Sequence, residues 1–141
     1  MNDMNYYDTL ITAAEDCPVD HGVVPAPRGG KKTVAVMQYE MLAESPHVYT
    51  QEDVLFDVWL ARQDLAEVSN DERRRLRAEF FAKPQACLRA SPLPKKHGWG
   101  LLFDPEGRVA LCAADSPRYR DLVGGAEPDV KLLPAMRSKR A

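Results

Sequence analysis

Cationic side chains gather in a stretch of the chain that contains no carboxylate. The twenty-four residues between Glu79 and Asp104 include four lysines and arginines, and the stretch ends in Trp99 between two glycines. A cationic loop beside an exposed indole can hold an anion and a planar group together. Arg89 and Trp99 are therefore candidate ligand-binding residues. The alternative is a solvated loop followed by a tryptophan that packs in the core.

A second cationic segment, residues 27–33, precedes a predicted helix and reads Pro-Arg-Gly-Gly-Lys-Lys-Thr. Unbonded amides at a helix start favour anions, and glycines allow a phosphate to approach the backbone. The segment is not a P-loop, because Lys32 occupies the position of the Ser or Thr of that motif. Arg28, Lys31 and Lys32 are thus further candidate anion ligands, although a plain loop with exposed lysines is the simpler interpretation.

Charge is unevenly distributed along the 141 residues, which have a net charge of −2. Residues 1–60 carry 3 basic and 10 acidic groups, whereas residues 61–141 carry 16 and 11. Three stretches are basic and free of acid: 21–39, 80–103 and 130–141, the last including a basic C-terminal tail at 134–141. If they converge, they form a focused positive site; the simpler expectation is that they point apart.

Cysteine chemistry offers a different class of function, a small enzyme. Cys17 or Cys87 could act as a nucleophile with His21 or His97 as base. The three cysteines are odd in number and show no C-x-x-C pair, so we expect reduced thiols, no metal site and no cofactor.

A third alternative is nucleic-acid binding through the arginines at 73–77 and the basic tail. Asp71, Glu72 and Glu79 flank these arginines, which predicts a solvated, ion-paired helix face instead. The acidic first half and a pI of about 5.9 also argue against nucleic-acid partners.

No signal peptide or bilayer-spanning apolar run is apparent, so we expect a cytoplasmic protein with no membrane partner.

Local patterns predict the elements that would position these residues within one domain, residues 1–141. Alternating residues predict a strand at 5–12 and a hairpin at 99–113 with its turn at 104–107. Helices are predicted at 33–44, at 70–82 and, as a shorter element, at 117–123. A further helix is predicted to begin after Thr50, which forms a capping-box pattern with Asp53. Three prolines predict an extended connection at 83–97, and a last strand could lie at 129–133.

These elements predict an α+β fold. We expect a small antiparallel sheet, formed by the N-terminal strand, the hairpin and possibly the C-terminal strand, packed against three main helices. The leading functional hypothesis is a cytosolic binding module for a small anionic ligand or an acidic protein segment. Arg28, Lys31, Lys32 and Arg89 would supply charge, and Trp99 a stacking face.

The order and spacing of several motifs are similar to a family of small uncharacterised bacterial and fungal proteins, a domain of unknown function. The motifs span nearly the whole chain, at 5–11, 16–18, 30–33, 49–56, 80–83, 87–93, 98–100, 106–111 and 135–141. The resemblance implies no established activity, cofactor or catalytic residue. It does imply departures from the family pattern, because His97 and Cys112 replace tyrosines and Leu102 replaces a common histidine. An enzyme that relied on that histidine would be inactive here.

Overall fold

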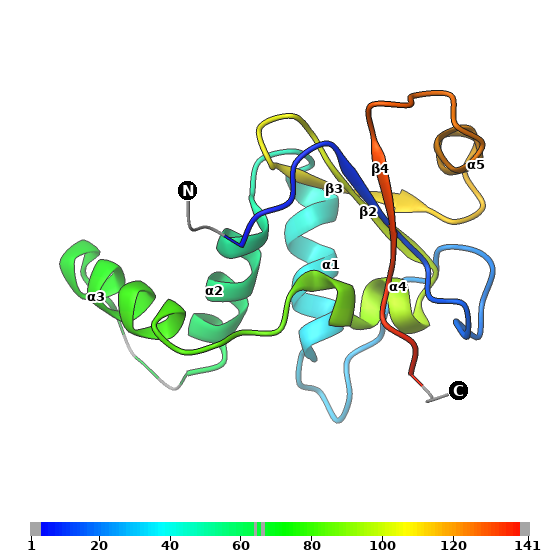
Figure 1. Cartoon of the computed structure of the whole chain (residues 1–141). Helices are drawn as coiled ribbons and strands as arrows, with labels where there is room; N and C mark the ends of the chain where they lie inside the picture. Colours follow the sequence, from blue (N-terminus) through cyan, green and yellow to red (C-terminus); the bar gives the residue numbers. More distant parts are fainter. Residues whose placement is uncertain (1–3, 64, 66, 139–141) are drawn as a thin grey trace.

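The computed structural model describes residues 4–63, 65 and 67–138. Its helices and strands follow one another along the chain as Figure 1 shows. In order they are β1 (Thr9–Thr12), α1 (Val34–Glu44), α2 (Gln51–Ala61), α3 (Asn70–Phe81), the 3-10 turn η1 (Leu88–Ala90), α4 (Pro92–Lys96), β2 (Trp99–Phe103), β3 (Val109–Ala113), α5 (Pro117–Val123) and β4 (Lys131–Pro134). The predicted α+β class is confirmed.

The four strands form one sheet in the order β3-β2-β1-β4. The hairpin partners β2 and β3 are antiparallel, and β1 runs antiparallel to β2, as predicted. The prediction of a purely antiparallel sheet is wrong for β4, which pairs parallel to β1 with Leu10 opposite Leu132. Between β3 and β4 the chain passes through α5 and a loop before it returns to the free edge of β1, so β4 runs in the same direction as β1.

Helices cover both faces of the sheet. The larger core joins one face to α1, α2 and α4, and contains Ile11, Leu42, Val54, Leu93, Leu101, Phe103 and Val109. On the opposite face Leu10, Cys112 and Leu122 pack under α5. Alternate strand residues therefore point to different cores, which is the pattern that the hairpin sequence predicted. Cys112 is 5% exposed and packs as a small apolar side chain.

The extended connection predicted at 83–97 is wrong, because this segment contains η1 and α4. Pro92 is the first residue of α4, where an amide has no partner within the helix, and Pro94 lies in the same turn. Prolines there start a helix instead of breaking it. The first strand is also shorter than predicted, because Asp8 adopts a positive φ of 47° and β1 begins only at Thr9.

Helix α3 projects beyond α2 at one side of the molecule, and none of its residues is buried (Figure 1). The predicted ion-paired face is present, because Arg74 pairs with Asp71 and Arg75 with Glu72 and Glu79. Two further pairs were not predicted: Arg73 and Arg77 reach across to Asp57 and Asp53 of α2. The arginine-rich segment thus uses its charges within the protein. None of the helices in the described part of the chain combines the length and apolar character needed to cross a membrane.

Candidate functional site

A groove at the start of α1 brings two of the three acid-free stretches together. Its volume is about 520 Å³, and three short segments form its walls. They are Pro25, Ala26, Pro27 and Arg28 from the preceding loop, Thr33, Val34 and Ala35 from the start of α1, and Pro92, Lys96 and His97 from α4 and its end. No carboxylate is among these lining residues. We call this the basic groove.

Buried polar contacts hold α4 against α1. Ser91 caps α4 by accepting a hydrogen bond from the amide of Leu93, and its hydroxyl donates to Gln38 Oε1 at 2.6 Å. Ser91 and Gln38 are both about 4% exposed. The preceding loop is tied to the same place, since the Val23 amide donates to the His97 carbonyl at 2.8 Å. These contacts set the position of Lys96 and His97 opposite the start of α1.

A tight turn presents Arg28 at the groove. Arg28 and Lys31 form a two-residue antiparallel turn, closed by backbone bonds of 3.0 and 2.9 Å in the two directions. Gly29 and Gly30 both have positive φ, of 55° and 77°, as this kind of turn requires. The glycines therefore serve the turn geometry, with open space where their Cβ atoms would stand. Lys31 is exposed on the same turn but does not line the groove.

The electrostatics of the basic groove favour a negative ligand. Within the described residues neither Arg28 nor Lys96 makes an ion pair, and both are exposed. The first turn of α1 contains no acidic residue, so its positive end is not offset by its own side chains. Burial and then the charge of Lys96 lower the pKa of the His97 imidazole, which favours its neutral form.

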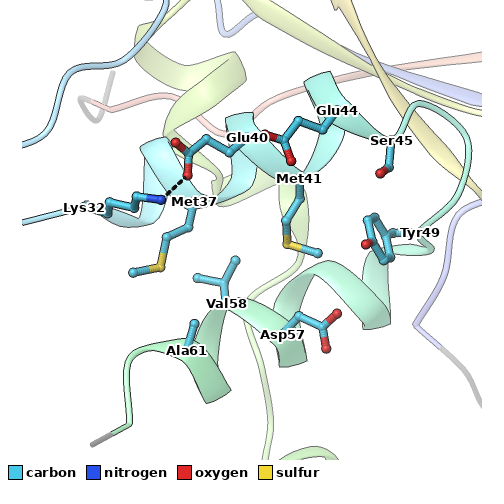
Figure 2. A pocket seen from close by; sticks show the side chains of 10 residues that line it. All are labelled: Lys32, Met37, Glu40, Met41, Glu44, Ser45, Tyr49, Asp57, Val58 and Ala61. Atoms are coloured by element: carbon cyan, nitrogen blue, oxygen red, sulfur yellow. Dashed lines mark hydrogen bonds and ion pairs between the residues drawn. The ribbon is translucent and has the colours of Figure 1, made fainter.

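Lys32, another sequence candidate, turns away from the basic groove. Its ammonium pairs with Glu40 at 2.8 Å and lines a different groove, between α1 and α2 (Figure 2). That groove also contains the carboxylates of Glu44 and Asp57. The two neighbouring lysines of the sequence thus face different surroundings.

Arg89 lies near the C-terminal strand instead of the basic groove. Its Nε donates to the Pro134 carbonyl at 2.9 Å, and its own carbonyl accepts from the Met136 amide at 2.9 Å. The third acid-free stretch therefore contacts Arg89 through Pro134 and Met136, whereas Arg28 and Lys96 line the basic groove. Lys139 and Arg140 of the basic tail lie outside the described residues.

Trp99 is enclosed by the protein on two sides. Its indole Nε1 donates to the Val23 carbonyl at 2.8 Å, and its ring lies 5.5 Å from the ring of Tyr39. A Cβ on Gly22 would stand only 2.8 Å from the indole, so this glycine makes room for the ring. The alternative of a packed tryptophan accounts for these contacts.

We predict that Trp99→Phe lowers the free energy of unfolding by about 1 kcal/mol, because the half-buried Val23 carbonyl loses its donor. Phenylalanine retains the ring packing against Tyr39. Urea denaturation checks this, with phosphate affinity measured on the same variant. Unchanged stability together with weakened phosphate binding would support the stacking role instead.

In the described part of the chain, neither thiol of the enzyme alternative is hydrogen-bonded to a histidine. The Tyr6 hydroxyl donates to Cys87 Sγ at 3.4 Å, and burial followed by this hydrogen bond raises the pKa of Tyr6 to about 12. His21 contacts Asp20, and no imidazole bonds to Cys17 or Cys87 within residues 4–138 as described. No cluster of three or more potential metal-ligating side chains was found in the same part of the chain.

The sequence indicated Arg28 as an anion ligand, but it indicated His97 only as a base for a thiol and did not single out Lys96. Lys96 and His97 lie in the acid-free stretch that the sequence drew attention to, directly after the missed helix α4. The signal that could have revealed them is the pair Ser91-Pro92, an N-cap followed by proline at the first helical position.

The fold and groove define a small α+β protein with a cationic, acid-free depression at a helix start. Over residues 1–141 the chain matches the family described as "Family of unknown function (DUF6157)", and it belongs to this family. Neither a curated protein nor a solved structure was found to match it.

Proposed function

We propose that the protein is a binding module for a small anionic ligand, and that the ligand occupies the basic groove. The observation that carries the proposal is the approach of Arg28 and Lys96, far apart in sequence, to one groove that no carboxylate lines. Unpaired cations in a concave, acid-free site attract phosphate and carboxylate groups.

The start of α1 supports the same ligand class. The amides of Val34 and Ala35 belong to the first turn, where no carbonyl of the helix can accept from them. Thr33 occupies only one such amide, because its hydroxyl accepts from Val36. An anion in the basic groove can therefore be bound by backbone amides together with Arg28 and Lys96.

A binding measurement with matched variants tests the proposal. We expect phosphate and phenyl phosphate to raise the melting temperature, and Arg28→Gln or Lys96→Gln to weaken their binding about tenfold, as for loss of one charge-assisted hydrogen bond. Arg120→Gln is the control, because this substitution removes the same charge from an exposed arginine of α5 that does not line the groove. Isothermal titration calorimetry gives the affinities.

Equal weakening in all three variants would mean a general effect of net charge, and would contradict a site in the basic groove. Absence of binding by any phosphate or carboxylate compound would also contradict it. Affinity for phenyl sulfate, whose charge is constant in this range, should rise as the pH is lowered from neutral to mildly acidic, because a bound anion stabilises the protonated form of His97, whose pKa is lowered in the free protein.

A further inference from the structure

The groove between α1 and α2 has the opposite chemical character. Its volume is about 520 Å³, and its walls combine an apolar strip with carboxylates. Figure 2 shows Met37 and Met41 of α1 pointing toward Val58 of α2, with Tyr49 and Asp57 at the end opposite Lys32. We call this the acidic groove. A groove of this size, with an apolar strip bordered by polar and charged side chains, suits a small amphipathic molecule.

Carboxylates outnumber cations in the acidic groove. Glu40, Glu44 and Asp57 line it, against the single ammonium of Lys32. Lys32 is engaged by Glu40, and Asp57 by Arg73 of α3, whereas Glu44 makes no ion pair within the described residues. The lining therefore has excess negative charge, with Glu44 able to accept a cation.

The direction of α1 adds to this negative charge. Glu44 is the last residue of α1, whose last turn contains no basic residue. The negative end of a helix favours cations, so a carboxylate there is electrostatically unfavourable in the free protein. Both ends of α1 thus carry charges that its dipole disfavours. Lys31 and Lys32 precede its positive N-terminal end, and Glu44 lies at its negative C-terminal end. A bound ion of opposite charge relieves that repulsion.

We propose that the acidic groove binds a small organic cation, a protonated amine that carries an apolar chain or ring. The ammonium group lies at the end formed by Glu44, Asp57 and Tyr49, where carboxylates and an aromatic face both attract it. The apolar part covers Met37 and Met41, whose flexible thioether side chains adapt to different shapes. The site is separate from the basic groove and does not depend on the proposed anion function.

Titration with three ligands of the same chain length tests this proposal. Amide chemical shifts of the isotope-labelled full chain are followed by NMR while hexylammonium, hexanol or hexanoate is added. We expect hexylammonium to shift resonances of residues 37–45 and 57–61, hexanol to bind more weakly, and hexanoate to leave them unchanged. Glu44→Gln should weaken hexylammonium binding about three- to fivefold, as for one partly exposed ion pair.

Asp121→Asn is the matched control, because Asp121 is an exposed acid of α5 remote from the groove residues, and it should leave binding unchanged. Arg28→Gln should also bind hexylammonium normally, which separates this result from the anion proposal. The proposal is overturned if hexanoate binds as well as hexylammonium, if Glu44→Gln binds normally, or if the same resonances shift on dilution without ligand. The last result would identify a second copy of the chain as the occupant.

Discussion

Gly98→Ala is expected to lower the free energy of unfolding by about 3 kcal/mol or more, combining a disfavoured backbone conformation with a backbone collision. Gly98 has a φ of 73°, and a Cβ there would stand 2.0 Å from the carbonyl oxygen of His21. The carbonyl cannot yield as a flexible side chain would. The loop would have to move, together with the bonds that tie Val23 to His97 and to Trp99.

Gly30→Ala provides the control for backbone conformation alone. Its φ of 77° is close to that of Gly98, but no atom lies within 4 Å of the position that its Cβ would take. We expect a loss of about 1 kcal/mol for this variant. Urea denaturation of both variants isolates the contribution of the collision. Equal losses would show that the His21 segment moves aside at little cost.

Phe56→Ala is expected to lower the free energy of unfolding by about 3–5 kcal/mol. Phe56 is fully buried, and its ring contacts Trp59 of α2 and Phe80 of α3. The guanidinium groups of Arg73 and Arg77 lie over the same ring, at 5.2 and 5.8 Å from its centroid. Because no residue of α3 is buried, this ring is a main anchor for the helix. Hydrogen exchange should therefore show reduced protection of residues 70–81.

Arg73→Gln distinguishes the contribution of the arginine charge to the attachment of α3 from that of the Phe56 ring. It removes the Asp57 ion pair and one cation over Phe56, and we expect it to cost about 1 kcal/mol or less. Phe56 itself remains in place in this variant. If Arg73→Gln destabilised the protein as strongly as Phe56→Ala, the attachment of α3 would depend on charge rather than on aromatic packing.

Short-range signals predicted most elements correctly. Thr33, Thr50 and Ser69 each cap a helix where the sequence placed one, and the Thr50–Asp53 capping box is formed in both directions. The turn at 104–107 closes with the Gly107 amide bonded to Asp104, and Gly107 has the expected positive φ of 82°. Such signals work because caps and turns are satisfied by residues only two to four positions apart.

The wrong prediction for residues 83–97 arose because proline has opposite effects at different positions of a helix. Pro92 and Pro94 interrupt a helix interior, yet they are tolerated in the first turn of α4. The parallel direction of β4 depends on the path that the chain takes from β3 through α5 to the edge of β1. No local pattern in 129–134 specifies that path. Both errors concerned elements next to candidate binding residues.

The candidate site also combines features that local sequence determines with features that only packing determines. The amino-acid sequence by itself determined the α+β class, the helix starts and the three stretches that carry cations without acids. Only the tertiary structure decided that Arg28 and Lys96 line one groove, that Lys32 is paired with Glu40, and that Trp99 is bonded to Val23. The reason is physical: charge and capping are local properties, whereas the meeting of distant side chains depends on how helices pack. Here the buried bond between Ser91 and Gln38, joining α4 to α1, helps set that packing.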